Sequence, residues 1–223
     1  MRRAILPLLV KRSLEQWLGI AALSFGCLCF GENTPADAGS LNPIVPPPDV
    51  PALTASAGET HYVMTDGSDA TGTGRSRDAA WATLSTALKH ADNGDVIVVG
   101  KGTYLLDSTL DVSRGITVLG RAGAAHTILD GRGARTCLVL KHPDARVEGL
   151  TVRNGYGNPG GVRIQAGTLR RCVVRDNASG SFKNHTYHGG VWAQGADSLV
   201  DSCVISGNRS GRYGQAGGAH IEK

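Results

Sequence analysis

The sequence predicts an all-β protein in which parallel strands stack in the successive turns of a solenoid. Segments that open on a glycine pair recur at offsets of 29 and 28 residues, at Gly160–Gln165, Gly189–Gln194 and Gly217–Glu222. A second predicted strand, Leu169–Val174, recurs at Val200–Ile205. Aromatic residues make up only 5% of the chain. A long repeat of short alternating strands, with few aromatic residues, favours a thin, repetitive β core over a large globular one.

The N-terminal 38 residues have the features of a secretory signal peptide. Basic residues precede an apolar run, Trp17–Phe30, and Ala36-Asp37-Ala38 offers small residues at the positions that a signal peptidase reads. The run is short compared with the ~20 residues that span a bilayer, so a membrane anchor is the less favoured alternative. We therefore expect a protein secreted to the extracellular space or the outer cell surface, with no transmembrane span in the mature chain.

Residues 39–58 predict a linker, because Pro, Ser, Ala and Thr dominate them and Pro46-Pro47-Pro48 stiffens the chain. The folded domain is expected at 59–223. The chain has a small net charge of +4, of which the first 38 residues supply only +1, and nothing in the mature chain indicates nucleic-acid binding.

One helix is expected before the main run of strands. Thr83 is a suitable N-cap and Asn93-Gly94 a suitable stop. Between them, apolar residues recur with the helical spacing i, i+3, i+4 and i+7, at Leu84, Ala87, Leu88 and Ala91. The open end of a solenoid exposes apolar side chains and unpaired strand edges, so we expect this helix to cap the N-terminal end.

Apolar residues at matching repeat positions predict three columns stacked along the interior, because neighbouring parallel strands lie ~4.8 Å apart. The columns are Val147, Leu169 and Val200; Leu150, Cys172 and Cys203; and Val152, Val174 and Ile205. Strands are expected to end at Asn154, Asp176-Asn177 and Gly207-Asn208, where Asn and Gly tolerate a left-handed backbone and stacked Asn side chains can hydrogen-bond. An antiparallel β-sandwich, the competing architecture, does not predict such columns.

Three cysteines remain after the predicted cleavage, Cys137, Cys172 and Cys203. Cys172 and Cys203 share one repeat position, and we expect them to be stacked, buried thiols. A disulfide between them is the alternative, because exported proteins favour disulfides where the geometry allows.

Several segments resemble secreted bacterial right-handed parallel β-helix proteins of the pectin-lyase-like superfamily. They are Tyr62–Asp69, Trp81–Leu84, Gly94–Val99, Gly102–Tyr104 and Gly149–Gly155. The resemblance covers residues 60–223 and implies one right-handed parallel β-helix domain. It also implies a C-terminally incomplete domain, because the chain ends four residues into the strand after Gly217-Gly218 and no cap follows.

The resemblance leads to two functional hypotheses. The first is binding or processing of an extracellular, acidic polysaccharide; an enzyme of this kind would be a polysaccharide lyase or a glycoside hydrolase. The second is a non-enzymatic cell-surface or adhesion passenger domain, because the glycine pairs and terminal Asn residues are similar to the repeats of polymorphic outer-membrane proteins. The expected partner is a polysaccharide or a surface receptor, and the expected oligomeric state is a monomer. No catalytic residue can be assigned.

The candidate binding residues follow from strand alternation. If Val162, Val191 and Ala219 point inward, then Arg163, Trp192 and His220 form one outward column, with Gln165, Gln194 and Glu222 in the next. A Trp beside Arg and His can stack a sugar ring and hold a carboxylate, although a solvated face with one exposed aromatic residue is the plainer interpretation.

Two loops carry further candidates. The corner at 179–188 contains Lys183, His185 and His188, and such insertions often hold the binding residues of a solenoid, although a plain polar turn is the simpler interpretation. Asp66 and Asp69 could ligate Ca²⁺, although their loop lacks the ligand spacing of an EF-hand. Finally, Glu148, Arg170 and Asp201 share one outward position, which predicts a surface ladder of ion pairs.

Overall fold

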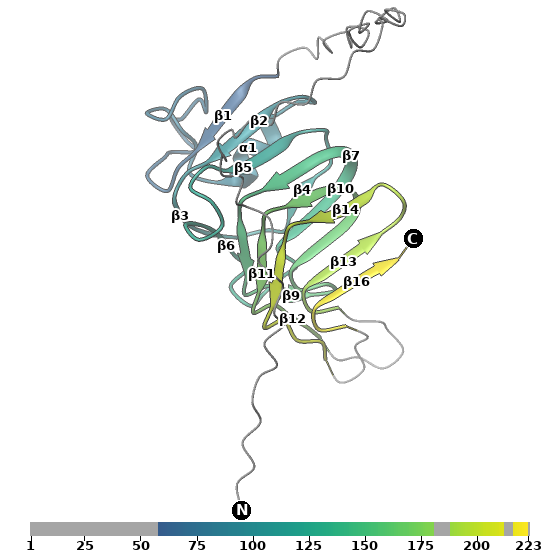
Figure 1. Cartoon of the computed structure of the whole chain (residues 1–223). Coiled ribbons are helices and arrows are strands. Elements are labelled where there is room, and N and C mark those ends of the chain that lie inside the picture. The colour runs from purple at the N-terminus through teal and green to yellow at the C-terminus, as the bar shows by residue number, and fades with distance from the viewer. Residues whose placement is uncertain (1–57, 181–187, 212–215, 223) are drawn as a thin grey trace, which may run out of the picture. The chain divides into compact units, whose positions relative to one another are not determined.

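The computed structural model describes residues 58–180, 188–211 and 216–222. The predicted signal peptide, and the predicted linker up to residue 57, lie outside these residues. The described part of the chain is mostly β-structure with a single α-helix (Figure 1).

The strands form three sheets. The nine-stranded first sheet contains β1 (Thr60–Val63), β2 (Val96–Val99), β4 (Leu110–Val112), β5 (Thr117–Gly120), β7 (Leu138–Glu148), β10 (Val162–Arg170), β13 (Val191–Gln194), β14 (Ser198–Asp201) and β16 (Ala219–Glu222). The five-stranded second sheet contains β3 (Gly102–Leu105), β6 (Thr127–Asp130), β8 (Thr151–Arg153), β11 (Val173–Arg175) and β15 (Val204–Ser206). The third sheet pairs β9 (Tyr156–Gly157) with β12 (Ala178–Ser179).

Every strand pair among the described residues is parallel, which confirms the predicted strand direction and excludes an antiparallel sandwich there. From β7 onward the chain runs from the first sheet to the second and back again, and in its first two passes it goes through β9 and β12 of the third sheet. Each pass therefore adds strands to the first and second sheets. Figure 1 shows β7, β10, β13 and β16 side by side as a result.

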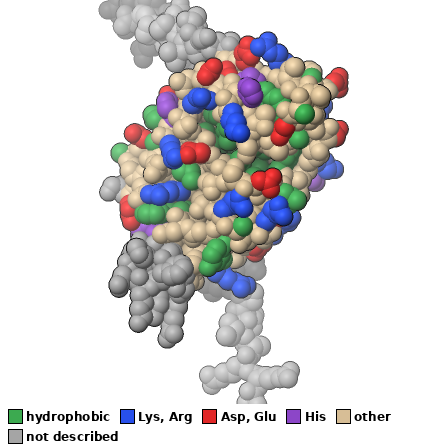
Figure 2. Space-filling model, turned by 180° about the vertical axis from the view of Figure 1, so that it is seen from behind, with side chains coloured by type: hydrophobic (Ala, Val, Ile, Leu, Met, Phe, Trp, Pro, Cys, Tyr) green, Lys and Arg blue, Asp and Glu red, His purple; other side chains and the backbone are tan. Residues whose placement is uncertain are grey.

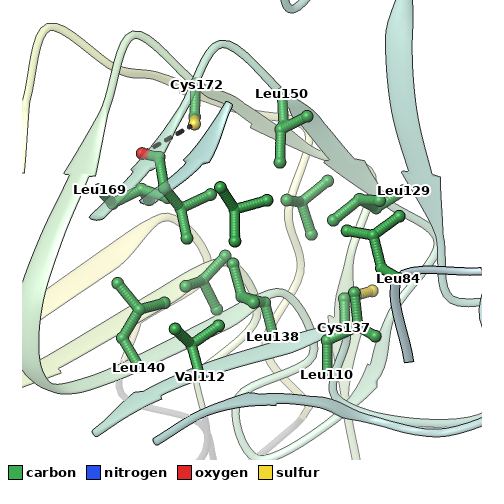
Figure 3. Packing of buried hydrophobic residues seen from close by; sticks show 14 of the residues in the cluster. Leu84, Leu110, Val112, Leu129, Cys137, Leu138, Leu140, Leu150, Leu169 and Cys172 are labelled. Carbon is green, nitrogen blue, oxygen red and sulfur yellow. Dashed lines mark hydrogen bonds between the residues drawn. The ribbon is translucent and has the colours of Figure 1, made fainter. Parts of the chain in front are cut away.

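Like positions of successive passes face one another, as the repeats predicted. In the first sheet Val147 pairs with Leu169, and Leu169 with Val200. In the second sheet Val174 lies between Val152 and Ile205. The first two members of each column are fully buried (0% exposed), so these columns form the core. Figure 3 shows Leu138, Leu140 and Val112 on one side of the interior, facing Leu129, Leu150 and Cys172 on the other.

The segment predicted as one strand at Leu169–Val174 is in fact two strands in different sheets. β10 ends at Arg170 and β11 begins at Val173, because Arg171 adopts a left-handed backbone (φ 48°) and turns the chain. The equivalent residues of the neighbouring passes do the same, Gly149 with φ 72° and Ser202 with φ 53°. The prediction was wrong because Arg and Ser give no signal for a left-handed corner, which glycine adopts far more readily.

The predicted asparagine corner is confirmed. Asn154, Asp176 and Gly207 all have positive φ, between 54° and 66°. Next to them, Asn177 is 1% exposed, and its Nδ2 donates to Asn208 Oδ1 (2.9 Å) and to the carbonyl of Val152 (3.1 Å). Its Oδ1 accepts from the backbone N–H of Gly155 (2.8 Å). These side chains therefore satisfy buried backbone groups of adjacent passes.

The glycine pairs permit close contact between passes. A Cβ built on Gly161 would lie 2.5 Å from the carbonyl oxygen of Gly190, and one on Gly190 would lie 2.2 Å from that of Gly218. No side chain fits at these distances. Glycine is therefore required at these positions because neighbouring backbones come too close for a side chain. Neither Gly161 nor Gly190 has a left-handed φ.

The helix α1 (Leu84–His90) begins as predicted, with Thr83 as its N-cap. Its Leu84 and Ala87 are buried, and it packs against β1 and β4, next to the first strand, where a cap was expected. It ends at His90, before the predicted Asn93-Gly94 stop. The chain becomes extended at Ala91 (ψ 138°) so that it can enter β2.

A buried His–Asp pair joins β1 to the turn before β2. Asp95 is 7% exposed and accepts hydrogen bonds from His61 Nε2 (2.9 Å) and from the backbone N–H groups of Glu59 (2.7 Å) and Asp92 (2.8 Å). Burial alone would raise the pKa of Asp95, but the hydrogen bonds from Asp92, His61 and Glu59 outweigh it, and the pKa falls below its ordinary value. The carboxylate thus stabilises the N-terminal end of the sheet in its charged form.

Asp95→Asn is expected to lower the free energy of unfolding by about 2 kcal/mol at pH 7, because the lost partner is a buried charged acceptor. Since the folded state lowers the pKa, the contribution is complete above the unfolded pKa of ~3.9 and disappears as the pH falls through the folded value. Urea denaturation at pH 7 and pH 3 measures both variants. The exposed Asp107→Asn is the control, and a gap between Asp95→Asn and wild type that stays constant with pH contradicts the argument.

The predicted ion ladder is only partly correct. Arg170 pairs with Asp201 (2.9 Å), but Glu148 pairs instead with Arg146 and with Arg171 (3.0 Å), whose corner position brings it closer. Figure 2 shows acidic and basic side chains interspersed over one face. Such exposed pairs contribute little to stability individually.

Candidate functional site

The three predicted binding residues lie in one column on the first sheet. Arg163 of β10 pairs with Trp192 of β13, and Trp192 pairs with His220 of β16. Their neighbours Val162 and Val191 are fully buried (0% exposed), so the column faces away from the core as alternation predicted. The structure therefore brings Arg163, Trp192 and His220 together.

Arg163 is held in place by two contacts. Its guanidinium carbon lies 4.6 Å from the centroid of the Trp192 ring, which is a cation–π contact. Its Nε and Nη2 both donate to Gln194 Oε1, at 3.2 Å and 3.0 Å. Both partners are uncharged. Among the described residues, Arg163 has no carboxylate partner, whereas Arg153 and Arg170 each pair with an aspartate.

His188 is buried completely (0% exposed), although the sequence placed it in a polar, exposed corner. Its ring stacks on His220 (centroids 4.5 Å apart, 18° between planes) and tilts against Trp192 (4.8 Å, 42°). Neither ring nitrogen of His188 has a hydrogen-bond partner among the described residues. Burial, and then the nearby His220, lower the pKa of His188, so this ring packs as a neutral aromatic group.

The Trp192 ring is consequently half-buried and is not free on the solvent side. Arg163 and His188 both lie against it. The contact with Arg163 follows from the predicted column, whereas the contact with His188 was not predicted, because His188 lies outside the strand, at a bridge to Ala216. The one sequence signal for the burial of His188 was its position directly before Gly189, where the chain enters the sheet.

His220 already contacts an acidic side chain of its own strand. Its Nε2 lies 2.7 Å from Glu222 Oε1, and this hydrogen bond is the main cause that lowers the pKa of Glu222, with smaller effects from Gln194 and Trp192. Glu222 pairs in register with Gln194, as the second outward column predicted. The cation left for an acidic ligand is therefore Arg163, since His220 already has a carboxylate.

The structure does not place every candidate. Lys183 and His185 lie outside the described residues. Ala219 and Ile221 occupy the predicted inward positions of β16 but are exposed, Ile221 at 59%. The reason is that β16 ends the strand order of the first sheet, so no described strand covers its far side.

Asp69, one of the two residues considered as Ca²⁺ ligands, has a structural role. Its carboxylate accepts hydrogen bonds from the backbone N–H groups of Ala82 (2.9 Å) and Thr83 (3.1 Å) and from the Thr83 hydroxyl (2.7 Å). Asp69 thereby fixes the residue that caps α1. Within residues 58–180, 188–211 and 216–222 no three His, Cys, Asp or Glu side chains gather as metal ligands, so Asp66 and Asp69 have no third partner there.

Comparisons with known proteins do not assign this chain to a family. No protein-family model matches the chain, and no curated protein or solved structure matches it significantly. No helix in the described part of the chain is long and apolar enough to cross a membrane. The class that the coordinates define is thus an all-β protein built from parallel sheets with one helix.

Proposed function

We propose that the domain is a right-handed parallel β-helix and that the protein is exported. The parallel pairing, the alternation between two sheets, and the contact of like residues in successive passes support the first part. The leader and the Pro-rich segment that precede the described residues support the second.

We further propose that the protein binds an extracellular acidic polysaccharide through the Arg163–Trp192–His220 column. The observation that carries this is the Arg163 guanidinium, which is fixed by Trp192 and Gln194 and has no described carboxylate partner. A uronate carboxylate can pair with the guanidinium, because arginine forms strong charge-assisted hydrogen bonds with planar anions. The half-buried Trp192 edge offers apolar contact for the sugar ring.

Arg163→Gln is expected to weaken retention on an immobilised polygalacturonate gel by about tenfold or more, because it removes a charged hydrogen bond to the ligand. Arg175→Gln is the matched control. Arg175 already pairs with Asp176 and lies on the second sheet, so this variant should bind as wild type does. Melting temperatures of both variants report whether the fold is intact.

Two results contradict the proposal. Unchanged retention of Arg163→Gln would place the binding elsewhere. A wild type that is retained on none of several acidic and neutral polysaccharide gels would favour the non-enzymatic surface or adhesion module.

A further inference from the structure

Cys172 and Cys203 are held face to face by the sheets around them. On one side Arg170 pairs with Asp201, and on the other Val173 pairs with Val204. The backbone N–H of Val204 donates to the carbonyl of Cys172 (2.9 Å). The two Cα atoms are therefore one strand spacing apart, ~4.8 Å, which lies inside the ~4.4–6.8 Å range of disulfides.

The two thiols are free, and they differ in exposure. Cys172 is 1% exposed, and its Sγ lies 3.1 Å from the carbonyl oxygen of Arg170. Cys203 is half-buried, and its Sγ lies 3.4 Å from the carbonyl oxygen of Leu169 and 3.3 Å from that of Asp201. An outside reagent can thus reach Cys203 before it can reach Cys172.

The two neighbouring thiols differ in how readily they ionise. The Cys172 thiol beside it lowers the pKa of Cys203 to about 7, against the effect of burial. The Cys203 thiol, together with burial, raises the pKa of Cys172. A thiolate is the nucleophile in thiol–disulfide exchange, so Cys203 is suited to attack first and Cys172 to attack second.

We propose that Cys172 and Cys203 form a reversible dithiol–disulfide site whose oxidant is a small disulfide such as oxidised glutathione. The Cys203 thiolate attacks the glutathione disulfide, forms a mixed disulfide and releases one glutathione thiol. Cys172 loses its proton and its sulfur attacks Cys203 Sγ, which releases the second glutathione thiol. The pair is oxidised to a disulfide and the reagent is reduced to two thiols, so electrons and protons balance.

The geometry indicates that the bond is labile. The side chains of in-register parallel strands are themselves ~4.8 Å apart, whereas disulfides need Cβ atoms ~3.5–4.5 Å apart. Closing the bond requires a small shift, which β15 can make because it ends the strand order of the second sheet. A strained disulfide is reduced more easily than a relaxed one.

Peptide mapping of the full chain tests this. The protein is incubated with oxidised glutathione, acid-quenched, alkylated and digested with trypsin. Cleavage after Arg171 and Arg175 releases Cys172 in a peptide of its own, separate from that of Cys203. We expect these two peptides joined and two hydrogen atoms lighter than the separate thiols, and separated again by dithiothreitol. The melting temperature should rise by several degrees, because the bond closes a loop in the unfolded chain.

Cys137 is the internal control. It is fully buried, and burial raises its pKa to about 12, so it should react more than about tenfold more slowly than Cys203. Cys172→Ser should stop the reaction at a glutathione adduct on Cys203. In the wild type, Cys172 and Cys203 both remaining thiols, or a Cys203 adduct that never resolves, overturns the proposal. The wild-type map decides the matter even if a variant fails to fold.

Discussion

Gly161→Ala is expected to destabilise the protein by about 3 kcal/mol, at the upper end of the usual cost of overpacking. The new methyl group would lie 2.5 Å from the carbonyl oxygen of Gly190 and 2.9 Å from a methyl carbon of Val174. The carbonyl cannot move away freely, because it accepts the backbone N–H of Val162 (2.9 Å). Relief therefore requires adjacent passes to separate, which breaks strand hydrogen bonds.

Gly218→Ala is the matched control, because Gly218 occupies the same repeat position. A Cβ there would lie 4.0 Å from a methyl carbon of Ile205, which is an ordinary van der Waals contact. Urea denaturation followed by circular dichroism should therefore show a large shift of midpoint for Gly161→Ala and almost none for Gly218→Ala. Similar midpoints for the two variants would mean that backbone entropy, common to both, outweighs contact between passes.

Asn177→Ala is expected to lower the free energy of unfolding by about 3 kcal/mol. The substitution leaves the backbone N–H of Gly155 without its side-chain acceptor in the interior, and such a loss costs about 1–3 kcal/mol. It also removes the hydrogen bonds from Asn177 to the carbonyl of Val152 and to Asn208. Asn208→Ala should cost about 1 kcal/mol, because Asn208 is only half-buried and water can replace its contacts. Thermal and urea unfolding measure both. Equal losses of unfolding free energy in the two variants would contradict this argument. They would show that the hydrogen bonds of Asn177, and not its burial, determine its contribution to stability.

Most of the correct fold prediction came from the sequence repeat. Val152 and Val174 occupy one repeat position, and stacked parallel strands place such residues in contact, so their register needed no long-range information. The same reasoning placed Arg163 beside Trp192. The corner at Arg171 escaped prediction because its residue type is neutral. Leu169 and Cys172 both belong to predicted inward columns although they are three residues apart, and alternation along a single strand does not allow this. That spacing was the only sign that strand alternation is interrupted there.

Contacts made outside the repeat could not be predicted. His61 and Asp95 are 34 residues apart and belong to no repeat unit, so no pattern links them. The burial of His188 depends on Trp192 and His220, which come from two different passes. A histidine that is buried as a neutral aromatic ring gives no periodic signal in the sequence. The interpretation of His188 as part of an exposed corner followed from composition alone.

The parallel stacking of passes also determines the order in which the domain can fold. In the first sheet each strand from β2 onward, apart from β4, pairs with one that precedes it in the sequence, beginning with β1 beside α1. The strand β4 pairs with the later strand β7. A ribosome or a translocation channel releases the N-terminal end first, so each of the other strands finds its neighbour already present. Such a chain can extend its structure one pass at a time from the helix end, with no need to wait for distant residues. A defect in an early pass should accordingly affect every pass after it, whereas a defect in a late pass leaves the earlier ones assembled.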